Sequence, residues 1–248
     1  ANAVSIGNAA GCDSQGTQGI AIGNIAGRVA QGDTAVAVGV AAGSNQQGAS
    51  SVAVGHQAGC GDQGNNSVAV GYFAGCAAQG NNAVAVGVNA GCNAQGTQGI
   101  AIGNVAGLTS QGANSVAIGN TAGCGDQGAQ SIAIGYFTAK VSQGINSVAV
   151  GREAGHTSQG GDAVAVGVNA GCNTQGANSV AVGHDAGLNQ QGTNSVAIGI
   201  QAGSGSQGTS STAVGVNAAR ISQGANATAI GDSAGYNQQG ANSVAVGS

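Results

Sequence analysis

Apolar and polar positions repeat along this chain with a period of 16 residues, and within each repeat apolar side chains alternate with small ones. In the stretch NSVAVG at 66–71, Ala69 separates Val68 from Val70, and Gly71 follows. Alternation of period two, with β-branched side chains on one side and a closing glycine, predicts a short strand over positions 2–6 of every repeat. A second extended stretch around positions 10–14 is expected to run back to the starting corner.

The repeat is regular over the whole chain, with no insertion between residue 1 and the half repeat at 241–248. Position 7 is always glycine, positions 15 and 16 are always Gln-Gly, and position 11 is glycine except at Ala139 and Ala219. Short regular repeats form solenoids because no single unit buries enough surface to be stable alone. We therefore predict an all-β fold over residues 1–248: a β-solenoid (β-roll) of about fifteen and a half 16-residue coils, with two short parallel strands per coil. We expect it to be a single repeat solenoid and a fragment of a longer repeat array.

The constant glutamine at position 15 is predicted to stack on its equivalent in the next coil. An amide carries two donors and an acceptor, so stacked glutamines can bond side chain to side chain. We interpret the column as structural and not as a ligand-binding row, because a ladder requires the same residue in every coil. The predicted ladder comprises Gln15, Gln31, Gln47, Gln63, Gln79, Gln95, Gln111, Gln127, Gln143, Gln159, Gln175, Gln191, Gln207, Gln223 and Gln239.

One side of the first strand carries only glycine, alanine or serine, at positions 3, 5 and 7. A solvent-facing strand would sample larger polar side chains, so this small face must be covered at close range. It either lines a narrow interior or packs against the same face of another chain. We favour the second alternative, with the Val/Ile pair inside the coil. The candidate interchain face is then Ala21, Ala37, Ala53, Ala69, Ala85, Ala101, Ala117, Ala133, Ala149, Ala165, Ala181 and Ala197.

All six cysteines stand at position 12, in a column that elsewhere holds Arg28, Lys140 and Tyr236. A column that accepts charged residues is expected to face outward. In-register stacking holds neighbouring Cβ atoms near the coil spacing of ~4.8 Å, beyond the usual ~3.5–4.5 Å of a disulfide, so bridges within the chain are not expected. Burial against, or a bridge to, another chain remains an alternative for the outward column, which comprises Cys12, Cys60, Cys76, Cys92, Cys124 and Cys172.

Composition excludes several classes of function. The chain has eight acidic and four basic residues, so it lacks the basic surface that nucleic acid requires, and no apolar run reaches the ~18 residues of a membrane span. The match of GCGDQG at 59–64 to GxGxxG follows from the repeat itself and lacks the strand–loop–helix context of a nucleotide site. His56, His156 and His184 fall in distant coils. We therefore expect no catalysis, no cofactor and no metal site.

Any specific recognition would have to use the variable corner at positions 8 and 9. This corner carries Tyr72-Phe73 and Tyr136-Phe137, and exposed aromatic pairs can make adhesive or sugar-stacking contacts. Surface or glycan contact through these corner residues is one alternative. Filling of a groove between packed copies of the chain is the interpretation that we favour.

The motif NSVAVG or NSVAIG, at Asn66–Gly71, Asn114–Gly119 and Asn194–Gly199, resembles the head repeats of the YadA-like trimeric autotransporter adhesins. Similar repeats occur in phage and viral tail fibres, and the resemblance implies a β-roll of stacked coils. We predict an extracellular structural filament, amyloid-like in its stacking, that assembles with copies of itself at a cell or virion surface. An adhesin head or a tail-fibre shaft that binds a surface is the main alternative, and an ice-binding protein is a third.

Overall fold

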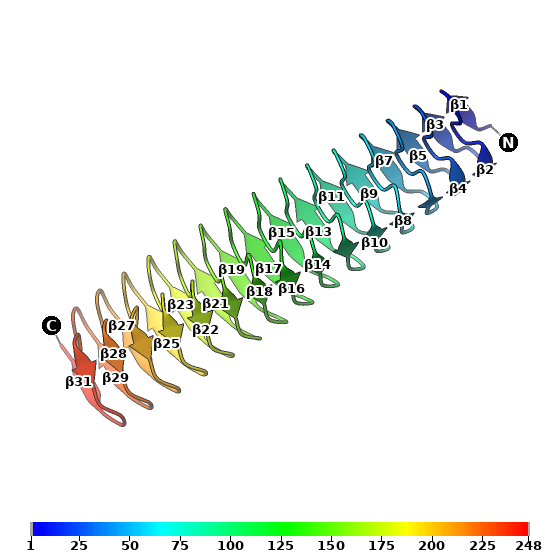
Figure 1. Cartoon of the computed structure of the whole chain (residues 1–248). Helices are drawn as coiled ribbons and strands as arrows, with labels where there is room; N and C mark the ends of the chain where they lie inside the picture. The colour runs from blue at the N-terminus through cyan, green and yellow to red at the C-terminus, as the bar shows by residue number, and fades with distance from the viewer. Residues whose placement is uncertain (1, 248) are drawn as a thin grey trace. The chain divides into compact units, whose positions relative to one another are not determined.

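The chain is an all-β parallel solenoid of about 15 turns, with a period of 16 residues and two short strands in each turn (Figure 1). The computed structural model describes residues 2–247, and none of these residues lies in a helix. The chain divides into two compact units, Ala1–Gly125 and Asp126–Ser248. The predicted fold class and the two strands per coil are confirmed.

In the first unit, two parallel sheets run along the stack of coils, one on each side of the coil. The first sheet contains β1 (Val4–Ile6), β3 (Ile20–Ile22), β5 (Val36–Val38), β7 (Val52–Val54), β9 (Val68–Val70), β11 (Val84–Val86), β13 (Ile100–Ile102) and β15 (Val116–Ile118). The second sheet, whose strands end at the constant glutamine, contains β2 (Asp13–Gln15), β4 (Val29–Gln31), β6 (Gln46–Gln47), β8 (Asp62–Gln63), β10 (Ala78–Gln79), β12 (Ala94–Gln95) and β14 (Ser110–Gln111).

The second unit repeats this arrangement. Its first sheet contains β17 (Ile132–Ile134), β19 (Val148–Val150), β21 (Val164–Val166), β23 (Val180–Val182), β25 (Val196–Ile198), β27 (Thr212–Val214), β29 (Thr228–Ile230) and β31 (Val244–Val246). Its second sheet contains β16 (Asp126–Gln127), β18 (Ser142–Gln143), β20 (Ser158–Gln159), β22 (Thr174–Gln175), β24 (Gln190–Gln191), β26 (Ser206–Gln207), β28 (Ser222–Gln223) and β30 (Gln238–Gln239).

Neighbouring strands pair in register, so each residue lies beside its equivalent one coil away. In the first unit Ala37 pairs with Ala53, and in the second unit Val164 pairs with Val180. Corner residues join the same ladder, since Gly48 N donates to Gln63 O at 2.8 Å. Within a unit, equivalent side chains therefore form columns that run from coil to coil.

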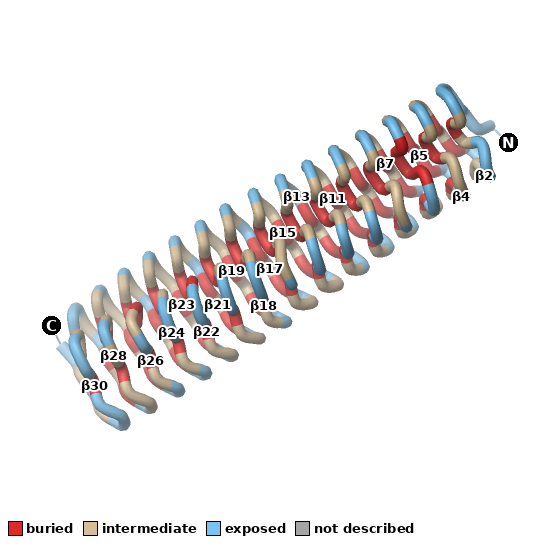
Figure 2. Tube along the Cα trace, viewed as in Figure 1, coloured by how far each residue is buried: buried red, intermediate tan, exposed pale blue. Residues whose placement is uncertain are grey.

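Between the two terminal coils, the interior is lined by alanine, serine and glutamine, and the Val/Ile pair is partly exposed on the outer side. Figure 2 shows the buried segments, in red, recurring from coil to coil. Ala21, Ala37 and the other alanines of position 5 as far as Ala197 have no exposed surface within the single chain. The prediction that these alanines form an interchain face is therefore wrong. They line the narrow interior, which was the other alternative.

The width of the interior explains this orientation. Gly107 lies so close to the glutamine that a Cβ atom at its position would stand 2.8 Å from Gln111 Oε1 and 3.3 Å from the Ala101 Cβ. A coil this narrow has no room for branched side chains on both strands. The size of the side chains, and not their hydrophobicity, decides which face of the first strand points inward.

The corners are built from residues in the left-handed backbone region. Position 2 has a φ of 55° at Asn66, and asparagine tolerates that conformation better than most residues. Position 9 requires the same conformation, even from Val105, whose φ is 60°. The variable corner therefore has a fixed backbone and changes only its side chains.

Candidate interaction surface

The outward side of the first sheet presents an apolar surface in each unit. We call the two columns at positions 4 and 6 the Val/Ile face; every residue in it is Val or Ile except Thr212 and Thr228. In-register pairing sets successive side chains of a column about 4.8 Å apart. Ile102 in the first unit is 38% exposed and Ile198 in the second is 40% exposed. Extended apolar surfaces of this kind usually mark an interaction site.

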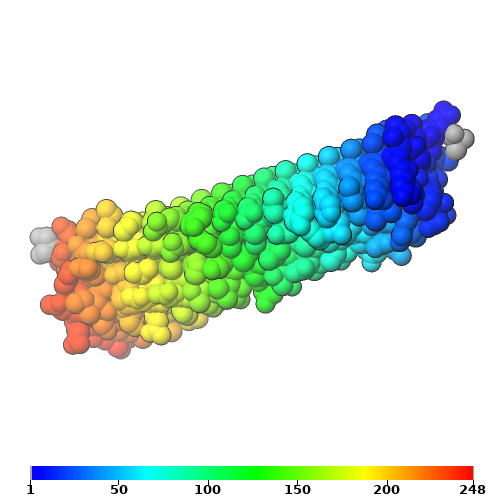
Figure 3. All heavy atoms as spheres, turned by 45° about the horizontal axis from the view of Figure 1, so that its top comes forward, coloured from blue at the N-terminus to red at the C-terminus, as the bar shows by residue number. Residues whose placement is uncertain are grey.

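Position 8 adds to the apolar surface in some coils of both units. Val40 and Val88 in the first unit, and Val168 and Ile200 in the second, are exposed at this position. They continue the alternation of positions 4 and 6 in the sequence. Figure 3 draws all heavy atoms and shows successive coils following one another in chain order. The apolar surface therefore gains a third column wherever position 8 is Val or Ile.

An aromatic cluster occupies the corner of two adjacent coils in the first unit. The rings of His56 and Tyr72 stack with centroids 5.3 Å apart and an interplanar angle of 17°. Phe73 meets Tyr72 edge to face at 4.5 Å. Tyr72 is 50% exposed, so the cluster presents aromatic surface to solvent.

A second aromatic cluster lies in the second unit and includes a cation. Tyr136 and Phe137 meet edge to face at 4.3 Å, and the Lys140 ammonium lies 4.7 Å from the Phe137 ring centroid. The His156 ring lies 6.4 Å from the Phe137 ring. Burial, and then the charge of Lys140, hold the pKa of His156 below its ordinary value.

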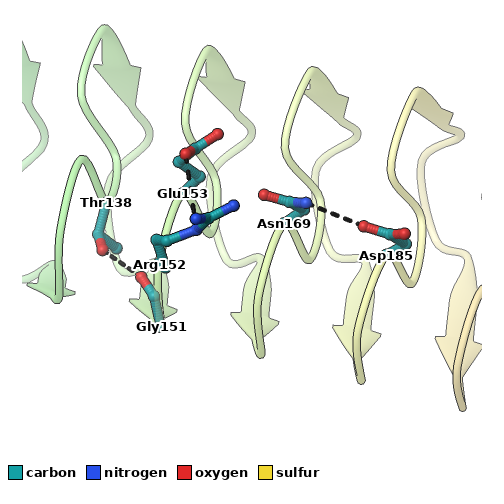
Figure 4. Close-up of polar contacts among 6 residues, drawn as sticks. All are labelled: Thr138, Gly151, Arg152, Glu153, Asn169 and Asp185. Carbon is teal, nitrogen blue, oxygen red and sulfur yellow. Dashed lines mark hydrogen bonds and ion pairs between the residues drawn. The ribbon is translucent and has the colours of Figure 1, made fainter.

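The next coils of the second unit replace the aromatic corner with polar residues (Figure 4). The Arg152 guanidinium lies 3.7 Å from the Glu153 carboxylate, and Asn169 Nδ2 donates to Asp185 Oδ1 at 3.0 Å. These contacts join residues of the same corner or of adjacent corners. The variable corner thus changes from an aromatic to a polar surface within one unit.

The constant glutamines from Gln31 to Gln239 are buried within the coil. Gln31 Nε2 donates to the Ile20 carbonyl on the opposite strand at 2.8 Å and to Gln47 Oε1 at 3.1 Å. The amide–amide bond recurs between Gln79 and Gln95 at 3.1 Å. Sequence reasoning found the stacked amides and missed the bridge across the coil. The bridge has a signature in the sequence, because the glutamine follows the first Val or Ile of its coil by 11 residues.

The cysteine column is only partly outward. Cys12 is exposed, Cys60, Cys76 and Cys92 are half-buried, and so is Cys124. The prediction of an outward residue is wrong for Cys172, which is buried. Its relative exposure of 9% lies close to that of its half-buried equivalents, so position 12 stands at the edge of the interior.

Among residues 2–247, no group of three or more His, Cys, Asp or Glu side chains is placed to hold a metal ion, and no helix has the length and hydropathy to cross a bilayer. A shallow hollow of about 350 Å³ in the first unit is lined by small residues and by Gln46, Gln47, Asp62, Gln63 and Gln79. Asp62 is the one ionisable residue among those that line it.

Comparison with known families adds an independent observation. Three segments, residues 78–106, 127–154 and 191–218, match the family model described as YadA head domain repeat (2 copies). No curated protein matches the chain. The resemblance of the repeats to those of YadA-like heads is confirmed, and the β-solenoid agrees with it.

Proposed function

We propose that the chain is the structural part of an adhesin-type fibre at a cell or virion surface, in which copies of the chain associate through their Val/Ile faces. The partly exposed columns of β-branched residues at positions 4 and 6 carry this proposal. Side chains such as Ile102 and Ile198 leave more than a third of their surface uncovered in the single chain. Removing apolar surface from water contributes about 25 cal/mol per Å², and this contribution opposes the entropy lost on association.

A second copy of the chain is the partner that fits this surface best. The face repeats every 16 residues, so a partner with the same period can match it coil by coil without a change of register. The match to YadA head repeats supports self-association, because YadA-like heads are trimeric in general. The face also lacks charged residues that would have to be desolvated.

The association can be tested by placing charges on the proposed interface. Val86→Lys and Ile102→Lys together put two ammonium groups on adjacent coils of the Val/Ile face. We expect the parent chain to form oligomers in analytical ultracentrifugation and the double variant to be monomeric, with an unchanged β-rich circular dichroism spectrum. The expected loss of affinity is at least tenfold, since two charges would have to be desolvated in an apolar contact.

The matched control uses the opposite side of the same two coils. Ala94→Lys and Ser110→Lys introduce the same charges at exposed positions of the second sheet. This variant should assemble like the parent. A parent chain that stays monomeric at high concentration, or a control that dissociates equally, would exclude the Val/Ile face as the interface.

Adhesion through the corner is a second candidate function, favoured by the exposure of Tyr72 and Tyr136, each 50% exposed. Flat aromatic faces of this kind can stack on the apolar side of a sugar ring. Binding of the parent to glycan-coated or cell surfaces should fall when both residues are replaced by serine. Equal binding by the parent and this variant would remove the corner from consideration.

A further inference from the structure

Three cysteines occupy position 12 in three consecutive coils of the first unit. Cys60 Sγ lies 3.1 Å from Cys76 Sγ and 3.5 Å from the Cys76 carbonyl oxygen. The backbone holds the column in register, because Gly61 N donates to Cys76 O and Ala77 N donates to Cys92 O, both at 2.7 Å. The two thiols therefore face each other across the boundary between neighbouring coils.

The geometry differs from the sequence-based expectation in one decisive respect. Coils that stack in register hold equivalent Cα atoms about 4.8 Å apart, which is inside the ~4.4–6.8 Å range of Cα separations in disulfides. Cβ atoms at the same spacing are farther apart than in most disulfides. The structure brings the sulfur atoms within contact distance by turning both side chains toward the coil boundary. A further approach of about 1 Å, within reach of side-chain rotation, would make a bond.

We propose that Cys60 and Cys76 are an oxidisable pair that forms a disulfide between adjacent coils. The bond would close a 16-residue loop, which is one full turn of the solenoid. It would link covalently two coils that hydrogen bonds and packing otherwise hold together. Both thiols are half-buried and remain accessible to a small reagent, whereas Cys172 is buried. The bridge is independent of the Val/Ile face, which uses positions 4 and 6.

The oxidation balances with a small disulfide such as oxidised glutathione. The thiolate of one cysteine attacks a sulfur of the reagent, which forms a mixed disulfide and releases one glutathione thiolate. The thiolate of the second cysteine then attacks the protein sulfur of the mixed disulfide and releases the second glutathione. The two thiol protons of the protein pass to the released glutathione, which is reduced by the two electrons that the protein loses.

Burial raises the pKa of the Cys76 thiol, and the neighbouring Cys60 and Cys92 thiols raise it further. Thiolate is the attacking species, so oxidation should be slow at neutral pH and faster in alkaline solution. Cys92 extends the column by one coil, and burial raises the pKa of its thiol too. Cys60 and Cys92 are the titratable groups that act on the Cys76 thiol.

The test is a thiol count combined with intact mass and peptide mapping. The folded chain is treated with oxidised glutathione at about pH 9, where thiolate forms more readily. Of its six thiols, we expect two to disappear with a mass loss of about two daltons, and the chain to stay monomeric on a denaturing, non-reducing gel. Cleavage before Asp62 separates Cys60 from Cys76, and the two fragments should stay joined until a reductant is added.

Two variants and one unfolded control keep the result interpretable. Cys76→Ser should abolish the link between these fragments, and Cys172→Ser should leave the loss of two thiols unchanged. Oxidation in denaturant should give mixed pairings, because the geometry of the coil no longer selects one. Retention of all six thiols, a disulfide-linked dimer of chains, or a link that survives Cys76→Ser would overturn the proposal.

Discussion

Ser5 Oγ donates a hydrogen bond to Gln15 Oε1 at 2.7 Å, between the two strands of the exposed first coil. Ser5 stands at the position where the other coils carry alanine. In those coils the glutamine oxygen often lacks a donor, and Gln31, Gln111 and Gln191 each have a buried Oε1 without a hydrogen-bond partner. The first coil therefore shows how the interior can satisfy an acceptor that the other coils leave unpaired.

Ala101→Ser should stabilise the chain, because the new hydroxyl can donate to Gln111 Oε1 as Ser5 does to Gln15. We expect a gain of about 0.5–1.5 kcal/mol in the free energy of unfolding, measured by urea denaturation. Ala101→Val is the control, because it places a larger apolar side chain at the same position. It should destabilise the chain by overpacking the interior. A serine variant no more stable than the parent would show that the interior has no room for the hydroxyl.

Gln191→Leu and Gln190→Leu give the sharpest test of the bridge across the coil, since both residues belong to β24. Gln191 is buried and donates to the Val180 carbonyl at 2.7 Å, whereas Gln190 is exposed. Gln191→Leu removes the side-chain donor to the part-buried Val180 carbonyl and the buried amide that spans the coil, and it should cost about 1–3 kcal/mol in stability. Gln190→Leu should change the stability by less than about 0.5 kcal/mol. Equal effects of the two substitutions would argue against the bridge.

Val105→Asn should stabilise the corner of its coil. Val105 has a φ of 60°, a left-handed conformation that is unfavourable for a β-branched residue and tolerated by asparagine. We expect a gain of about 1 kcal/mol in thermal or urea denaturation. Val88→Asn, at a corner position without positive φ, is the control and should bring no gain. A gain of the same size in both variants would assign the effect to polarity instead of backbone strain.

The coil architecture could be predicted from the sequence, and the inward face could not. The alternation in 66–71 and the constant 16-residue period are sufficient for strand positions, stacking and register. Alternation alone does not say which side of a strand faces inward, and hydrophobicity favoured the wrong side. The deciding quantity is the narrow gap between the two sheets. The Gln111 side chain crosses this gap, and its Nε2 donates to the Ile100 carbonyl at 2.7 Å.

The candidate sites, too, could be predicted only in part from the sequence. The Val/Ile columns were visible in the sequence, but their exposure depends on the inward face and could not be read from the pattern. The column of Cys60 and Cys76 was also visible, and in-register spacing alone argued against a bond. The direction in which the two side chains turn places their sulfur atoms 3.1 Å apart, and that direction is a property of the folded coil.

His156 should titrate below the ordinary histidine range, because burial and the charge of Lys140 lower its pKa. The unfolded chain then binds the proton at a higher pH than the folded chain, so stability should fall as the pH drops below about 6.5. Lys140→Gln should raise the pKa of His156, measured by NMR titration of its ring protons. His156→Gln should remove the dependence on pH over this range. A pKa that does not respond to loss of Lys140 would rule out the electrostatic contribution.

Ala133→Lys and Ile134→Lys place the same charge on opposite sides of strand β17. Ala133 has no exposed surface, whereas Ile134 is 37% exposed. An ammonium group at Ala133 would have to enter an interior of alanine and glutamine, at a cost of several kcal/mol or more, so the coils around it should open. Hydrogen exchange should show lost protection in those coils of Ala133→Lys, and retained protection in Ile134→Lys together with weaker association between chains. If Ala133→Lys keeps its protection and Ile134→Lys loses it, the assignment of inward and outward faces is reversed.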